Sequence, residues 1–185
     1  KIKFDEEFIE ELCDRCFESV SIVQECCRKA CREAGVFATQ ASVTRITAPK
    51  NVETLIKEVV DQQRGRYHAF ITNFADGFKE TQFEMYRWLL FPILTSDAKT
   101  LEEGLTYAEI RRNLQDNHPN KGDLNPGNIT QALKSATSLQ IQKNIKPIVL
   151  DYDATTRRLT VVDRGFLIWL ANQSQQEVLE IAALA

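Results

Sequence analysis

The segment TYAEIRRNLQDNHPNKGDLNPGNITQALKSATSL, residues 106–139, decides the fold because it contains two helix starts on either side of a polar turn. Thr106 stands where it can cap a helix over residues 107–116, and Glu109 follows three positions later, which is the pattern of a capping box. Asn125 followed by proline is a favoured pair at the start of a helix. The segment therefore predicts two capped helices joined by a turn.

The second of these helices, which starts at Pro126, is predicted to have one apolar face. Apolar residues recur on it at a spacing of three or four: Ile129, Leu133, Ala136 and Leu139. The polar residues left to face outward are Thr130, Gln131, Lys134, Ser135, Ser138 and Gln142. Glutamine can pair with adenine, and lysine with guanine or a phosphate, so this face is a candidate nucleic-acid site. The same composition is equally that of a solvated helix surface.

A β-hairpin is predicted after this helix. Residues 148–152 and 159–162 are rich in branched apolar side chains, which favour strands. The residues between them include Arg157 and Arg158. The prediction is a hairpin with a basic tip, and these two arginines join the candidate nucleic-acid site.

Two further helices complete the module. Residues 81–91 are strongly apolar, and Pro92 marks the expected end of that helix because proline interrupts the backbone hydrogen bonds. Asp163 can cap a last short helix. Three helices followed by a short antiparallel hairpin are typical of a winged helix. We therefore predict a winged-helix domain over residues 81–171, followed by a C-terminal tail over 172–185.

Two amphipathic helices are predicted near the N-terminus, over residues 5–16 and 19–34. Asp5 and Ser19 are suited to cap them, and Gly35 to end the second. The apolar spacing of the second helix predicts this buried face: Val20, Val23, Cys27, Ala30 and Ala34. The pair is predicted to form a helical hairpin.

The rest of the N-terminal half connects this hairpin to the winged helix. Residues 36–49 have little helix propensity and complete a lid-like subdomain over 1–50. Asn51 can cap a long helix whose apolar spacing continues to Asp76, within a connecting segment over 51–80. The predicted fold class is mainly α: a helical hairpin or lid-like subdomain, then a winged-helix domain with a small β-hairpin wing.

Composition places few limits on function. With 43% hydrophobic and 26% charged residues among 185, the sequence is that of an ordinary globular protein. Its apolar runs are much shorter than the roughly 20 residues that span a bilayer, so we expect no membrane segment and a cytoplasmic location. Because the sequence starts at Lys1 without a signal peptide, we interpret it as a piece of a longer protein.

Charge distribution points only weakly to a partner. Residues 106–147 carry six basic and three acidic side chains, whereas the whole chain has a net charge of −3. A local surplus of three positive charges is compatible with a polyanion partner, and also with an ordinary solvated surface. DNA and a protein partner therefore both stay open.

The cysteines raise the possibility of zinc. All five lie early in the chain, at Cys13, Cys16, Cys26, Cys27 and Cys31, and the first two form a CxxC motif. Both groups fall within predicted helices and partly on apolar faces, where free cysteine packs as a small hydrophobic residue. We predict free thiols, no metal site and a reducing compartment.

No catalytic constellation is evident. His68 and His118 are the only histidines, and neither has a nucleophile beside it in the sequence. Glu102 and Glu103 are predicted to be a solvated pair rather than an acid and a base. No GxxxxGK motif is present to bind nucleotide phosphates. We therefore predict no catalytic residues and no cofactor in this chain.

Taken together, four segments resemble the C-terminal region of a bacterial AAA+ or STAND-like ATPase, in which a helical lid precedes a winged helix. The lid-like segment is FDEEFIEELCDRCFESVSIVQECCRKACREAG at 4–35. The winged-helix-like segments are YAEIRRNL at 107–114, NPGNITQALKSA at 125–136 and IVLDYDATTRRLTVVD at 148–163.

The resemblance implies a non-catalytic regulatory and binding region. It implies that ATP and Mg are bound by a domain upstream of Lys1, and that the winged helix binds DNA or packs on a protein, including that ATPase domain. Lids of such ATPases often sense the nucleotide through an arginine near the start of a later helix. The second helix here opens with Glu18, Ser19, Val20 and Ser21, so nucleotide sensing is not implied.

Overall fold

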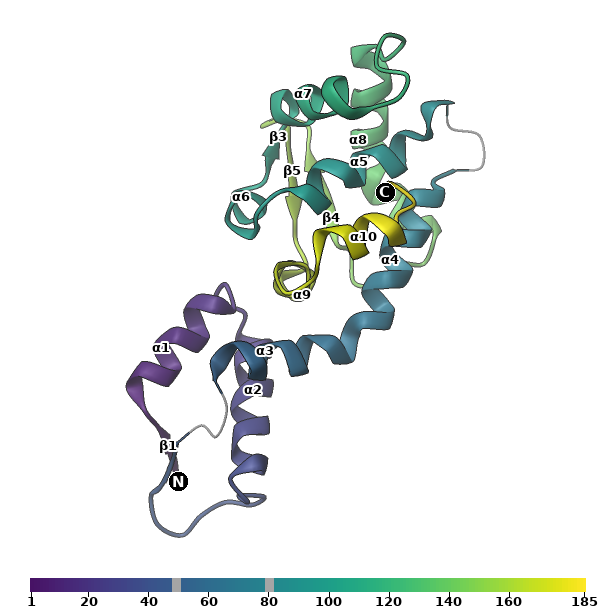
Figure 1. Ribbon diagram of the computed structural model, residues 1–185. Coiled ribbons are helices and arrows are strands. Elements are labelled where there is room, and N and C mark those ends of the chain that lie inside the picture. The colour runs from purple at the N-terminus through teal and green to yellow at the C-terminus, as the bar shows by residue number, and fades with distance from the viewer. Residues whose placement is uncertain (48–50, 79–81) are drawn as a thin grey trace. The chain divides into compact units, whose positions relative to one another are not determined.

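A computed structural model describes residues 1–47, 51–78 and 82–185 (Figure 1). These residues fall into two compact units, Lys1–Arg64 and Gly65–Ala185. Most of them are helical, and the strands are few and short. The prediction of a mainly α fold is confirmed. None of the helices in the described ranges is long and apolar enough to cross a membrane.

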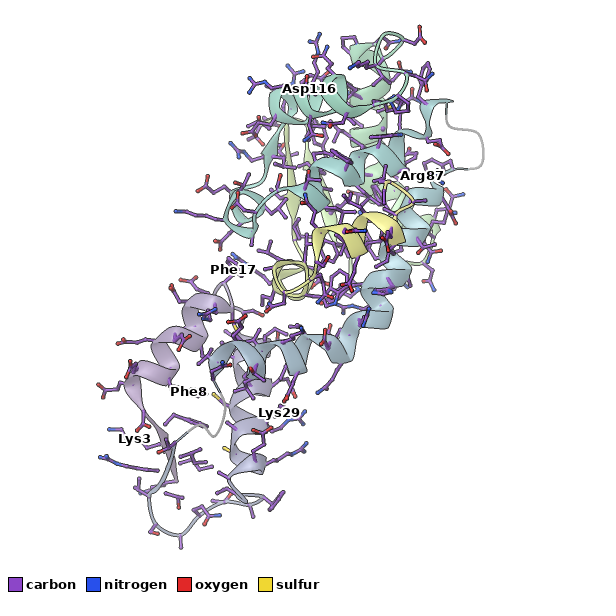
Figure 2. The ribbon with its side chains drawn as sticks, in the orientation of Figure 1. Lys3, Phe8, Phe17, Lys29, Arg87 and Asp116 are labelled. Carbon is purple, nitrogen blue, oxygen red and sulfur yellow. The ribbon has the colours of Figure 1, made fainter. Side chains whose placement is uncertain are left out.

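The first unit is built on three helices: α1 (Glu6–Arg15), α2 (Val20–Glu33) and α3 (Val52–Val60). The two predicted N-terminal helices are confirmed, and Gly35 has the positive φ of 74° that suits a residue after a helix end. α3 packs against both α1 and α2. Lys29 of α2, labelled in Figure 2, forms an ion pair with Glu58 of α3 at 3.1 Å.

The buried face of α2 differs from the prediction. Ile22, Cys26 and Ala30 are at most 3% exposed, whereas Val20 is 67% exposed. Two apolar stripes overlap on this helix, and the sequence alone does not determine which of them is buried. The contacts with α3 select the stripe that contains Ile22, because a helix buries the face that meets its neighbour.

Two short strands in the first unit were not predicted. β1 (Ile2–Phe4) and β2 (Thr44–Ile46) form a parallel pair, with Phe4 opposite Ile46. The ring of Phe4 stacks on Phe8 of α1, and Ile46 is 2% exposed. The segment 36–49 was expected to be only a connection, and its final residue, Pro49, lies outside the described residues. Strands of three residues are too short to show a period in the sequence.

The predicted long helix after Asn51 is present in two pieces. Asn51 caps α3 by accepting a hydrogen bond from the Thr54 amide at 2.7 Å. A 3-10 turn, η1 (Asp61–Gln63), separates α3 from α4 (Arg64–Asp76). The boundary between the two compact units follows Arg64, the first residue of α4.

The second unit contains most of the secondary structure. Its further helices are η2 (Gln82–Glu84), α5 (Met85–Thr95), α6 (Ala98–Glu103), α7 (Tyr107–Asn117), α8 (Pro126–Gln142), α9 (Arg164–Ala171) and α10 (Gln175–Ile181). Its strands are β3 (Leu105–Thr106), β4 (Leu150–Asp153) and β5 (Arg158–Val161). They form one antiparallel sheet in the order β3-β5-β4 (Figure 1).

The three predicted helix caps in this unit are confirmed. Thr106 and Glu109 form a capping box at α7, and Asn125 and Asn128 form another at α8. Hydrogen bonds from Thr106 lower the pKa of the Glu109 carboxyl. Asp163 accepts from two amides at the first turn of α9. Each cap satisfies backbone N–H groups that have no partner inside the helix.

The limits of α5 correct the prediction of a helix over 81–91. The predicted start, Thr81, lies outside the described residues, and α5 begins only at Met85 because Phe83 and Glu84 have positive φ. The helix then continues through Pro92 to Thr95. An internal proline costs about 3 kcal/mol. Burial of the apolar side chains of α5 offsets this, at roughly 1.5–3 kcal/mol for each large one.

The core of the second unit is aromatic. Tyr67 and Phe70 of α4 contact Phe166 of α9, with ring centroids 5.5 and 5.1 Å apart, and Tyr67 lies 5.2 Å from Trp169. α9 therefore packs on the aromatic core of this unit. Burial raises the pKa of Tyr67, whose hydroxyl accepts a hydrogen bond from Arg66. The expected tail over 172–185 contains α10, which packs against α5.

Candidate nucleic-acid interface

The start of α8 is held firmly in place. The side chain of Asn125 accepts from the Asn128 amide at 3.0 Å, and the side chain of Asn128 accepts from the Asn125 amide at 3.2 Å. The hydroxyl of Tyr107, at the start of α7, donates to the Pro126 carbonyl at 3.2 Å. The helices α7 and α8 are thus linked at their N-terminal ends.

Four of the six predicted contact residues on α8 are exposed: Gln131, Lys134, Ser138 and Gln142. They recur at intervals of three or four residues and form one stripe. Thr130 is half-buried, and its hydroxyl donates to the Pro126 carbonyl at 2.8 Å. Ser135 is also half-buried and hydrogen-bonds to Tyr86 of α5. These two residues support the helix, and the exposed stripe is narrower than the sequence suggested.

The hairpin between β4 and β5 is as predicted in position. Leu150 pairs with Val161, and Asp153 pairs with Arg158. Asp153 accepts hydrogen bonds from the Thr156 hydroxyl and the Thr155 amide, each at 2.7 Å. These bonds lower the pKa of the Asp153 carboxyl and hold the turn in one conformation.

The two arginines of the hairpin have different surroundings. Arg157 is exposed, and its guanidinium carbon lies 4.4 Å from the centre of the Tyr107 ring. Arg158 is half-buried, and its Nη1 donates to the carbonyls of Glu103 at 2.9 Å and Gly104 at 2.6 Å. The expected basic tip therefore consists of Arg157 alone. Arg158 is the first residue of β5 and anchors the loop that leads into β3.

Acidic groups lie close to the candidate face. Asp151 of β4 accepts a hydrogen bond from the Thr137 hydroxyl of α8 at 3.0 Å. Asp151 and Asp153 are both exposed. Their negative charge opposes that of Lys134 and Arg157, so the face has little net positive charge.

Gln140 of α8 is a structural residue that the sequence analysis missed. It is fully buried, and its amide makes four hydrogen bonds to backbone groups of α8 and the start of β4. A signal was available, because position 140 follows Leu133 and Ala136 on the apolar stripe. A polar residue at a buried helical position indicates a partner that needs hydrogen bonds.

The cysteines lie in the first unit as free thiols. Cys16 and Cys26 are fully buried and hydrogen-bond to each other. Burial raises the pKa of the Cys27 and Cys31 thiols, which disfavours reactive thiolates. Among the residues in the described ranges, no three His, Cys, Asp or Glu side chains are grouped to hold a metal ion.

Each of the two histidines packs against neighbouring groups of the second unit. His118 is 2% exposed, and its Nδ1 accepts from the Asn120 amide at 2.9 Å. The ring proton is therefore on Nε2, which donates to the Phe83 carbonyl at 2.9 Å. The ring of His68 packs edge-on against Trp169, 5.7 Å between centroids.

The predicted solvated pair, Glu102 and Glu103, lies at the end of α6. Glu102 forms an ion pair with Arg164 of α9. The carbonyl of Glu103 accepts from Arg158. Both residues thus connect α6 with its neighbours, and neither carboxyl is buried.

Comparison with known proteins yields no relative: no family model, curated protein or solved structure matches the chain. The second unit holds the residues of the candidate interface. Its central feature is the exposed α8 stripe with Arg157 on the adjoining hairpin.

Proposed function

We propose that this chain is a non-catalytic regulatory and binding region of an ATPase, in which residues 82–171 form a winged helix that binds duplex DNA through α8. The observation that carries the proposal is the exposed stripe of Gln131, Lys134, Ser138 and Gln142 on a helix whose start is held by a capping box. ATP and Mg would be bound by a domain upstream of Lys1.

The order of the secondary structure supports the winged-helix assignment. α5, α7 and α8 are followed by the β4–β5 hairpin, as three helices and a wing are in that fold. α5 packs against both α7 and α8, and β3 pairs with the first two residues of β5, next to the hairpin turn. This arrangement leaves the outer face of α8 and the turn containing Arg157 available to a partner.

The chemistry of the stripe suits the major groove. From Gln131 to Gln142 the helix rises about 16 Å, at 1.5 Å per residue, which covers several base pairs. Glutamine can read adenine, and Lys134 can contact guanine or a phosphate. Arg157 would contact a phosphate beside the groove and set the register of the protein on the duplex.

Neutralising Lys134 and Arg157 together is expected to weaken DNA binding about tenfold at low salt. The variant Lys134→Gln/Arg157→Gln removes two phosphate contacts and keeps polar side chains. Because each contact releases a counterion, the slope of log K against log salt should fall by about 2. Fluorescence anisotropy with a labelled duplex of about 20 base pairs, over a series of salt concentrations, measures both quantities.

A matched control removes the same charge elsewhere. Lys3 in the first unit and Lys99 on α6 are exposed and belong to neither α8 nor the β4–β5 hairpin. Lys3→Gln/Lys99→Gln should leave the affinity within about twofold. An equal loss in both double variants would show that attraction is diffuse, and absence of binding by the unaltered chain at low salt would reject the DNA proposal.

Protein packing is the second candidate, and a specific observation favours it. Ile141 of α8 directly precedes Gln142 and is 65% exposed. Val162, after β5, is 49% exposed. Exposed apolar side chains suit a protein surface better than a phosphate backbone. If the unaltered chain shows no DNA binding but self-associates, and Ile141→Asp abolishes that association, the α8 face is a protein contact.

A further inference from the structure

A second candidate binding site lies in the second unit, away from the exposed stripe of α8. It is a cavity of about 120 Å³ between α4 and the chain segment that follows α8. Phe70, Ile145 and Val149 line it and are at most 8% exposed. Three cationic residues also line it: Arg66, Lys143 and Lys146. The cavity thus has an apolar interior and a basic rim.

The net charge of the rim comes from its two lysines. Arg66 is neutralised by Asp163, with 2.6 Å between Nη2 and Oδ2. The ammonium groups of Lys143 and Lys146 make no hydrogen bond or ion pair with the part of the chain that the structure describes. Lys143 lies at the C-terminal end of α8, where the negative end of the helix dipole favours a positively charged side chain. Lys146 is exposed and follows the end of that helix, so the dipole does not explain it.

The size of the cavity limits what can enter. An engineered apolar cavity of about 150 Å³ accommodates benzene. The present cavity can therefore take one leucine or a similar apolar side chain. A DNA phosphate would satisfy the two lysines but would leave the apolar interior empty.

We propose that this cavity is a docking site for an acidic peptide segment, which inserts one apolar side chain while its carboxylates pair with Lys143 and Lys146. The site is separate from the α8 stripe and does not depend on the proposed DNA binding. Burial of the anchor side chain supplies most of the affinity, because exposed ion pairs contribute only about 0.2–1 kcal/mol each.

The test uses a fluorescein-labelled acidic peptide with a single central leucine, and a second peptide in which serine replaces the leucine. Anisotropy should show binding of the leucine peptide and at least tenfold weaker binding of the serine peptide. Lys143→Ala/Lys146→Ala should weaken the leucine peptide about three- to tenfold, from the loss of two exposed ion pairs. Ala69→Leu should weaken it similarly, because Ala69 lines the cavity, is exposed on α4 and tolerates a larger helix-forming side chain.

Lys99→Ala/Lys121→Ala is the matched control, since it removes two charges from exposed lysines that do not line the cavity and should leave peptide affinity unchanged. Equal binding of the leucine and serine peptides would overturn the proposal, as would no binding of either to the unaltered chain. If Lys143→Ala/Lys146→Ala weakens duplex DNA but not the peptide, the lysines belong to the nucleic-acid interface instead. Peptide binding without DNA binding would reject the α8 proposal alone.

Discussion

Replacement of Gln140 by leucine is expected to lower the free energy of unfolding by about 3 kcal/mol or more. The side chain amide joins α8 to the first residues of β4. Nε2 donates to the carbonyls of Ala136 at 3.1 Å and Leu150 at 2.7 Å. Oε1 accepts from the amides of Val149 at 2.7 Å and Leu150 at 3.1 Å.

Leucine would fill a similar volume but would leave the Leu150 carbonyl and the amides of Val149 and Leu150 without their partner, whereas the Ala136 carbonyl keeps its bond within the helix. Val149 and Leu150 are at most 2% exposed, so water cannot replace the lost bonds. Each buried group left unsatisfied costs about 1–3 kcal/mol. β4 lies at one edge of the three-stranded sheet, and Gln140 takes the place of a neighbouring strand there.

Urea denaturation followed by circular dichroism measures this loss. Gln142→Leu is the control, because Gln142 is exposed two residues away on the same helix and its replacement should change stability by less than about 0.5 kcal/mol. Similar midpoints for the two variants would show that the amide does not hold β4.

Replacement of Gly104 by alanine is also expected to lower the free energy of unfolding, again by about 3 kcal/mol. Gly104 ends α6 with φ 82° and ψ 151°, a region that is open almost only to glycine. An added Cβ would lie 2.7 Å from Cγ2 of Thr160 and 3.0 Å from the carbonyl oxygen of Leu159. Backbone strain and steric overlap therefore act together at the point where β3 joins β5.

Thermal and urea denaturation of Gly104→Ala should be compared with Gly122→Ala. A Cβ at Gly122 would meet nothing within 4 Å, and its φ is not positive, so this control should be nearly neutral. Thr160→Ala removes the closest contact and should recover part of the loss when combined with Gly104→Ala. If the two substitutions show no such coupling, the loss of stability in Gly104→Ala comes entirely from backbone strain.

The candidate site was predictable where exposure follows helical spacing. Gln131, Lys134 and two further stripe residues are exposed because the opposite face of α8 is apolar. The sequence did not indicate that Ser135 meets Tyr86, or that Arg158 meets the carbonyls of Glu103 and Gly104. Those contacts join residues far apart in the chain, and no local pattern specifies them.

Local hydrogen bonding explains what the sequence by itself determined about this protein. Each of three capping residues, Thr106, Asn125 and Asp163, accepts a hydrogen bond from an amide at most three residues away. The starts of α7, α8 and α9 are therefore determined by neighbouring residues in the sequence. The apolar spacing of α8 likewise determined which side of that helix is buried.

Only the tertiary structure decided features that depend on distant partners. It pairs β1 with β2 across some forty residues, and it keeps Pro92 inside α5 because that helix is buried. It also places the Gln140 amide against β4. In each case packing or hydrogen bonding with a remote segment outweighs the local preference, which is why the sequence alone did not predict these features.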